Sequence, residues 1–325
     1  MMSTAQRKQK PQLAGAKGTP AAVATTPSIP FFPFARYYSL LGVHTSLLAF
    51  TGLFLPRTRL SFLIDQTSSS PETRNVLTTL TENPPRTLGW ICLGAFILQI
   101  WWSNWVRGWL LESRELQNTE PTSGDRTDQK LKQKEWNSGK LNALFKASVT
   151  TLAASVVFHV VILLFGAPLN SHYLHTYLLA LLTSLLTVFT PSFALGPPTI
   201  KTDDSESLVR RMTWIRLFAE LSPRSPVERA IVYPSIGAFL GCWVGAIPLG
   251  LDWERPWQAW PLTPAYGILS GYIIASLCAS ATSGITYLAQ ADIYLTQQQQ
   301  LEKEAASRTK PRTKSGKKSK TKPSV

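Results

Sequence analysis

Long apolar segments alternate with polar and charged segments along the 325 residues of the chain. A bilayer core about 30 Å thick is crossed by roughly twenty consecutive apolar residues in a helix. Helices are favoured over a β-barrel because the apolar runs are continuous and do not alternate with polar residues. The pattern predicts an all-α polytopic membrane protein with about six transmembrane helices. The expected spans are residues 34–55, 88–111, 149–168, 173–195, 230–250 and 262–288.

The six spans make up one transmembrane domain over residues 34–290, with a polar tail on each side. The N-terminal tail, residues 1–33, is basic and rich in Pro, Ala and Thr. The C-terminal tail, residues 291–325, is basic and rich in Lys, Ser and Thr. Because neither tail has apolar periodicity, both are predicted to be disordered. No cleavable signal peptide is visible, so the first span is expected to serve as the insertion signal.

The distribution of positive charge predicts the orientation of the helices. Lys and Arg number 33 against 19 Asp and Glu, which gives a net charge of +14. With six spans, both tails share one side with loops 112–148 and 196–229, and these segments hold 26 Lys and Arg against 5 on the other side. Such residues accumulate on the cytosolic side of a membrane. We therefore expect both termini in the cytosol and segment 251–261 on the lumenal or external side.

Titratable side chains are sparse inside the expected spans. No span has Asp or Glu near its centre, which lowers the expectation of a proton-coupled transporter. His159 is singled out near the middle of a span, either as a proton relay or, as is commoner, as a neutral hydrogen-bonded side chain. His172 and His175 share a helix face, but no convincing third ligand lies near them in the sequence. None of the three cysteines has metal-ligand spacing: Cys92, Cys242 and Cys278. We expect no catalytic residues, no metal and no cofactor.

Small residues recur at every fourth position in the last two spans. Such ladders let the backbones of two membrane helices approach closely. Two explanations stay open and are compatible: the two spans pack on each other, or one ladder docks another membrane protein. The helix-packing residues expected on this basis are Gly237, Gly241, Gly245, Gly267, Gly271 and Ala275.

The segment between these spans, residues 251–261, combines three tryptophans with three charged residues and two prolines. Tryptophan is enriched at the headgroup level of membranes, and proline stiffens a turn. By composition the segment is an interfacial anchor, and it also has the character of a recognition loop, because Trp and Arg are common interface anchors.

The string PLGLDWERPWQAWP, preceded by GAFLGCWVGA and followed by a Gly-rich span, resembles the signature of the PIG-F family. The segment Leu164–Leu169 is also similar to that family, and the likeness covers roughly residues 145–290. The resemblance implies a multispanning endoplasmic reticulum protein of glycosylphosphatidylinositol (GPI) anchor biosynthesis. Such proteins are non-catalytic subunits that bind and stabilise the large ethanolamine-phosphate transferases, which transfer phosphoethanolamine to GPI mannose on the lumenal side.

The leading hypothesis is therefore an accessory subunit in the endoplasmic reticulum membrane, and not an enzyme. Its expected partners are a large membrane ethanolamine-phosphate transferase and membrane lipids, without nucleic acid. The last two spans are expected to dock the partner's membrane helices. The residues expected to shape the junction are Asp252, Trp253, Arg255, Pro256, Trp257 and Trp260.

Two alternatives stay open. One is a lipid transporter or flippase-like protein, which moves substrate in liposomes without a partner. The other is a membrane-embedded transferase that acts alone, with His159 or Asp252 in catalysis.

Overall fold

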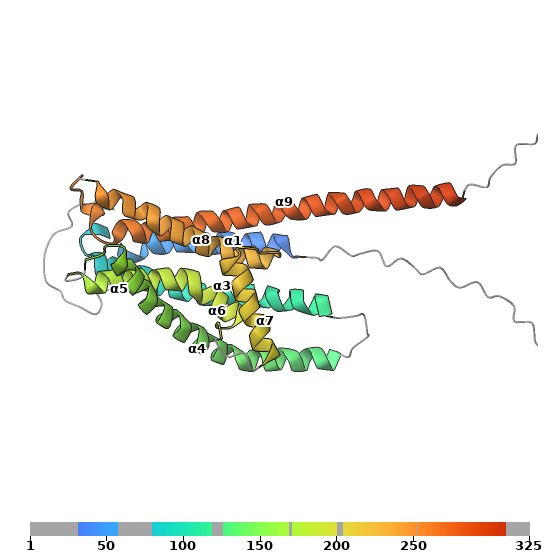
Figure 1. Ribbon diagram of the computed structural model, residues 1–325, viewed down its shortest axis with the longest axis horizontal. Helices are drawn as coiled ribbons and strands as arrows, with labels where there is room; N and C mark the ends of the chain where they lie inside the picture. The colour runs from blue at the N-terminus through green and yellow to red at the C-terminus, as the bar shows by residue number, and fades with distance from the viewer. Residues whose placement is uncertain are drawn as a thin grey trace, which may run out of the picture. The chain divides into compact units, whose positions relative to one another are not determined.

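The computed structural model describes residues 32–57, 80–118, 126–168, 171–199, 204–251 and 253–309, and every regular element in these ranges is a helix (Figure 1). The all-α prediction is confirmed. The α-helices are α1 (Phe34–Leu53), α3 (Pro84–Asn118), α4 (Arg126–Leu164), α5 (Tyr173–Ser184), α6 (Thr190–Leu195), α7 (Ser205–Trp214), α8 (Pro226–Ala246) and α9 (Leu262–Thr309). Short 3-10 helices are η1 (Leu55–Arg57), η4 (Ile247–Gly250) and η5 (Pro256–Gln258), and the π-helical turns are η2 (Leu185–Phe189) and η3 (Ile215–Ala219).

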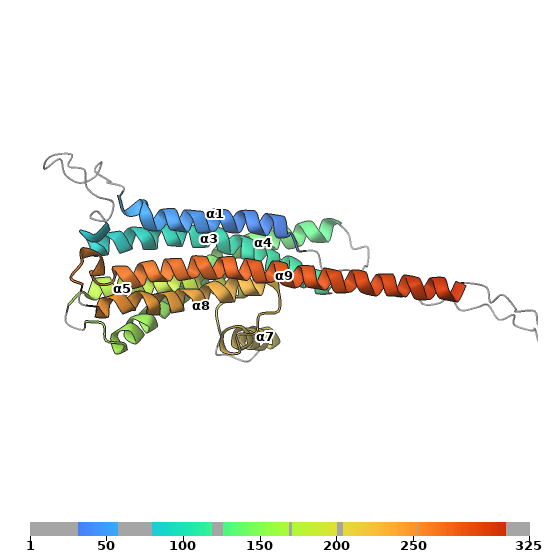
Figure 2. The ribbon, with the colours of Figure 1, turned by 90° about the horizontal axis from the view of Figure 1, so that it is seen from above.

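The long helices run side by side as a bundle, and α7 lies crosswise to them (Figures 1 and 2). Helices α8 and α9 form the most extensive contact between any two described elements, followed by α4 with α5. Helix α3 lies between α1 and the α5–α6 pair and contacts both. The chain thus forms a helical bundle in which α8 and α9 are the most closely associated pair.

Five helical segments are long and apolar enough to cross a membrane. They correspond to five of the six expected spans and are Phe34–Arg57, Gly139–Leu164, Tyr173–Leu195, Pro226–Gly250 and Leu262–Ala305. The expected span 88–111 lies inside α3, which is not among the five. The count of six spans therefore stays a prediction.

Two polar residues near the middle of α3 lie inside the bundle and lower its mean hydropathy, whereas Asn104 is exposed. Gln99 and Ser103 are fully buried. The hydroxyl of Thr190 donates to Oε1 of Gln99 at 2.6 Å, and Oγ of Ser103 lies 3.0 Å from the same hydroxyl. The exposed side chains of α3 include the apolar Leu93 and Ile97. Mean hydropathy counts polar residues irrespective of the side they face, so it understates how apolar the outer surface of α3 is.

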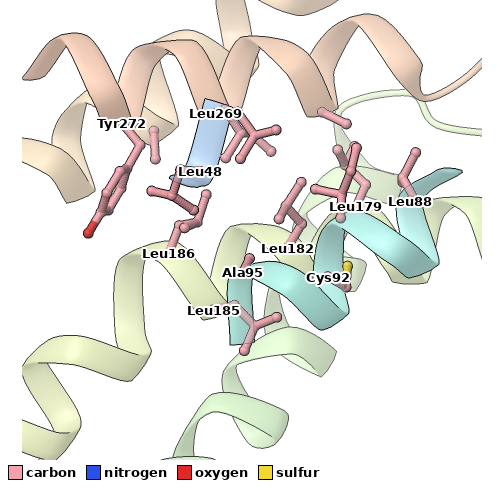
Figure 3. Packing of buried hydrophobic residues seen from close by; sticks show 14 of the residues in the cluster. Leu48, Leu88, Cys92, Ala95, Leu179, Leu182, Leu185, Leu186, Leu269 and Tyr272 are labelled. Carbon is pink, nitrogen blue, oxygen red and sulfur yellow. The ribbon is translucent and has the colours of Figure 1, made fainter. Parts of the chain in front are cut away.

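One of the buried clusters that make up the core is a mainly aliphatic layer contributed by α1, α3, α5, η2, α8 and α9 (Figure 3). Leu48 meets Leu269 and Leu186 near its centre, and Cys92 and Ala95 of α3 border it (Figure 3). Because lipid tails are as apolar as leucine, such side chains stabilise membrane helices through close packing and not through escape from water. The layer packs α9 against α1, α3 and α5 and so joins the α8–α9 pair to the rest of the bundle.

Pro191 lies within the continuous helical span formed by α5, η2 and α6, and a side chain of α8 compensates for it. Proline has no N–H, so the carbonyl of Thr187, four residues earlier, lacks its usual helical partner. The buried hydroxyl of Ser235 on α8 lies 3.2 Å from that carbonyl and shares its hydrogen with the carbonyl of Ile231 in its own helix, at 2.9 Å. Neighbouring serine or threonine side chains commonly satisfy carbonyls freed in this way inside membranes. This bond ties α8 to the core of the bundle.

Helix α9 continues to Thr309, well beyond the expected end of the last span at Leu288. The expectation of disorder from residue 291 is therefore wrong up to Thr309. Residues 297–305 (QQQQLEKEA) are strong helix formers, and the preceding turns of α9 remove the cost of nucleation. The rest of that tail, and the expected N-terminal tail up to residue 31, lie outside the described residues.

Candidate functional site: the α8–α9 seam and its connecting turn

The two ladders of small residues face each other across the seam between α8 and α9. A β-carbon added to Gly241 would overlap the carbonyl oxygen of Gly267, and one added to Gly271 would overlap that of Gly237. A β-carbon on Gly245 would lie 2.5 Å from the carbonyl oxygen of Thr263. The backbones of the two helices therefore touch directly along the seam, with no room for any side chain at these positions.

An apolar groove of about 790 Å³ runs along the same seam. Its floor includes the glycines of both ladders, and Leu240, Val244 and Ile274 line it with exposed side chains. Trp257 and Pro248 belong to its lining at the end near the connecting turn. Since the ladders already contact each other, the surface that remains free for another molecule is this groove and not the glycines alone.

Gln258 holds the turn between α8 and α9 together, and the sequence interpretation missed it. Its Oε1 accepts from the backbone N–H of Arg255 at 2.8 Å, and its Nε2 donates to the carbonyls of Pro248 and Leu251, both at 2.7 Å. One side chain thus bonds three backbone groups of the turn, and the carbonyls of Pro248 and Leu251 also accept from the N–H groups of Leu251 and Trp253. A glutamine between two tryptophans gave no obvious signal, although an amide near chain-reversing prolines is well suited to this role.

The tryptophans of the turn lie in different surroundings. Trp260 is half-buried and its Nε1 donates to the hydroxyl of Thr176 on α5 at 3.1 Å, which ties the turn to the bundle. The peptide bond from Trp260 to Pro261 is cis. Trp253 is exposed and packs edge-on against Trp257, with ring centroids 5.7 Å apart. Trp260 is therefore an internal anchor, whereas Trp253 and Trp257 face the outside and the groove.

The charged residues of the turn that the structure describes, Glu254 and Arg255, do not pair with each other. Arg255 and Pro256 are exposed, and Glu254 is exposed with a left-handed φ of 45°. Among the described residues no ion pair joins Arg255 to Glu254. Asp252 lies outside the described residues. The side chain of Arg255 is exposed, and its backbone N–H donates to Gln258.

A second polar cluster, also missed, fixes the start of α8. Ser225 and Glu228 form a capping box, which the sequence Ser-Pro-Val-Glu could have predicted. Arg216 donates to both carboxylate oxygens of Glu228, and this hydrogen bonding raises the pKa of the guanidinium above its usual value. Arg229 donates to the hydroxyl of Thr286 on α9 at 3.1 Å. Hydrogen bonds from these two arginines therefore fix the end of the seam that lies opposite the turn.

The histidines are scattered through the bundle. The rings of His172 and His175 are 4.7 Å apart, and no group of three His, Cys, Asp or Glu side chains comes together within the described ranges. His159 is half-buried with its ring 6.0 Å from that of Tyr177. The sequence interpretation overlooked His44, which lies in the middle of α1, is fully buried and stacks on Trp102 with centroids 4.8 Å apart.

These features first define a class of protein: a polytopic helical membrane protein whose most unusual surface is an apolar, glycine-floored groove capped by a tryptophan-rich turn. The family model described as "GPI biosynthesis protein family Pig-F" matches residues 71–280, which is more than half of the chain. The chain belongs to this family.

Curated relatives match a shorter stretch. The human "GPI ethanolamine phosphate transferase, stabilizing subunit" is 35% identical over 136 residues, which are 42% of this chain and 57% of that protein. The mouse protein of the same name is 34% identical with the same coverage. "Glycosylphosphatidylinositol anchor biosynthesis protein 11" of Pyricularia oryzae is 40% identical over 126 residues, 39% of this chain and 42% of that protein. The chain thus spans about half the length of these relatives, and no solved structure matches it.

Replacing Gly241 by Ala tests the backbone contact at the seam. The added methyl would overlap a backbone carbonyl of α9, so the helices must separate, at a cost of about 1–3 kcal/mol. We expect a lower thermal unfolding midpoint of the purified protein in detergent. Gly42→Ala on α1 is the matched control, because nothing lies within 4 Å of a β-carbon there. Equal midpoints for the two variants would contradict the seam geometry.

Replacing Gln258 by Ala tests the turn. The variant loses three hydrogen bonds to the backbone, and we expect a destabilisation of about 1–3 kcal/mol together with faster hydrogen exchange in residues 248–258. Arg255→Ala is the control, because it removes an exposed side chain and keeps the backbone bond to Gln258. If Arg255→Ala loosened the turn as much as Gln258→Ala, the central role of Gln258 would be wrong.

Proposed function

We propose that the chain is a non-catalytic membrane subunit that binds and stabilises a GPI ethanolamine-phosphate transferase. It would thereby support the transfer of phosphoethanolamine to GPI mannose during anchor biosynthesis. The observation that carries the proposal is membership of the Pig-F family together with mammalian relatives whose names describe a stabilizing subunit.

The geometry of the seam supports a role in binding another membrane protein. Leu240, Val244 and Ile274 project from α8 and α9 beside a floor of glycines, and each is more than half exposed. A helix laid into this groove could approach the two backbones closely, which is the arrangement that membrane helices use to associate. We propose that the groove receives a transmembrane helix of the transferase.

The turn adds charged and aromatic side chains at one end of this proposed contact. Arg255 is exposed and Trp253 projects beside Trp257, which also lines the groove. Trp and Arg are the residues that most often dominate binding at protein interfaces. Trp253, Arg255, Pro256 and Trp257 are therefore proposed to contact the partner, while Trp260 positions the turn through Thr176. Asp252 is proposed at the same junction from the sequence alone.

The proposed location is the endoplasmic reticulum membrane, with both termini in the cytosol. The excess of Lys and Arg in the tails and in loops 112–148 and 196–229 supports this orientation. The turn at residues 251–261 then lies on the lumenal side, where the transferase acts on the GPI glycan. In this arrangement the groove opens toward the lipid and the turn toward the lumen.

Filling the groove tests the proposal. We expect Val244→Trp to reduce the amount of transferase that co-purifies with the tagged chain by about tenfold, because a bulky side chain in a packed contact costs about 1–3 kcal/mol. The wild-type chain should retain the transferase in near-equal amount. Co-purified proteins are measured by mass spectrometry after solubilisation in a mild detergent.

Val156→Trp is the matched control, since Val156 is exposed on α4 and does not line the groove. It should leave the co-purified transferase unchanged. Loss of the transferase in both variants, or in neither, would count against the groove as the docking surface. A wild-type chain that is recovered folded and without any transferase would count against the proposed function itself.

A further inference from the structure

Helix α7 is the one α-helix in the described part of the chain that runs across the bundle. Figure 1 shows it crosswise to α9, and Figure 2 shows it end-on. It belongs to the connection between the span that ends at Leu195 and the span that begins at Pro226. Since both neighbours are candidate membrane spans, a crosswise helix between them lies parallel to the membrane plane, at the level of the membrane surface.

One side of this helix carries a stripe of uncovered apolar side chains. Leu208, Val209 and Met212 of α7 and Ile215, the first residue of η3, are all exposed, with Val209 at 63% and Met212 at 55%. Positions 208, 212 and 215 recur at the i, i+4, i+7 spacing that places side chains on one helical face, and Val209 borders them. An exposed apolar stripe of this kind is unfavourable in water and requires an apolar environment.

The opposite side of α7 is the one attached to the protein. Trp214 donates from its Nε1 to the carbonyl of Gly196 at 3.0 Å, and the guanidinium of Arg210 lies against the same glycine. Leu217, in the π-helical turn that follows, is fully buried among residues of α6 and α8. The attachment fixes the rotation of α7, so the apolar stripe points away from the bundle.

The charges of α7 and its neighbours suit a membrane surface on the side that carries the positive tails. Glu206, the one acid within α7, is paired with Arg210 at 2.7 Å. Arg211 is exposed beside the apolar stripe. A helix with an apolar face, a basic flank and attachment at the ends of two spans has the features of an interfacial amphipathic helix.

We propose that α7 lies in the cytosolic face of the bilayer, with Leu208, Val209, Met212 and Ile215 among the upper acyl chains and Arg211 at the lipid phosphates. The ligand class is therefore the phospholipid headgroup region, with anionic lipids favoured. Through Arg216 and Glu228 this contact sets the level of the start of α8 in the membrane. The inference shares with the proposed function only the orientation taken from the Lys and Arg distribution, and it involves neither the groove nor the transferase.

The test uses the full chain reconstituted in phosphatidylcholine vesicles that contain phosphatidylserine. A fluorophore is attached at Val209→Cys or, as the control, at Glu206→Cys, in a background with Cys242→Ala and Cys278→Ser, while the buried Cys92 is kept. We expect the label at position 209 to be quenched by nitroxide-bearing lipids and several-fold less by aqueous iodide than the label at position 206. Equal quenching of both labels by iodide would overturn the proposal.

Protection of position 209 from both quenchers would also overturn it, because a covering protein segment and not lipid would then occupy the stripe.

A second measurement avoids the cysteine background. The wild-type chain is photolabelled with a phospholipid that carries a diazirine on its acyl chain, and labelled peptides are mapped by mass spectrometry. We expect labelling within residues 208–215 and none above background in residues 297–301 of α9. Equal labelling of the two segments would contradict the proposal.

Discussion

Direct backbone contact between α8 and α9 is the constraint on which the rest of the structure depends. At Gly241, Gly267 and Gly271 even a single added carbon would overlap a carbonyl oxygen of the facing helix. In a membrane the hydrophobic effect does not bring helices together, so close approach and the resulting dispersion contacts carry much of their association. The glycines also leave the outer side of the seam shallow, and this shallow strip is the floor of the apolar groove.

Polar side chains hold the seam in place at three levels. At one end Gln258 closes the turn and Trp260 ties it to Thr176 of α5. In the middle Ser235 satisfies the carbonyl that Pro191 leaves free. At the other end Arg216 and Glu228 fix the entry into α8. These bonds lie at both ends of the seam and near its middle, so together they specify one arrangement of the two helices.

The sequence predicted the features that depend on regular spacing. Continuous apolar runs gave five spans that the structure bears out by length and composition, and the four-residue spacing of the glycines placed them on one face of each helix. The sequence did not predict features that depend on which side of a helix faces the bundle, or on contacts between residues brought together only by folding. Mean hydropathy could not show that Gln99 faces inward, and His44 was overlooked although it lies at the centre of α1. The role of Gln258 depends on carbonyls that only the folded turn brings within reach.

The most direct test of the central claim is to identify what touches the groove in native membranes. A photo-crosslinking amino acid is placed at Leu240 or at Ile274, and the crosslinked product is mapped to single residues by mass spectrometry. The account predicts crosslinks to a transmembrane helix of an ethanolamine-phosphate transferase from both positions, and none to the transferase from Val156 on α4. Crosslinks to lipid alone at both groove positions, from a chain that remains folded, would contradict it.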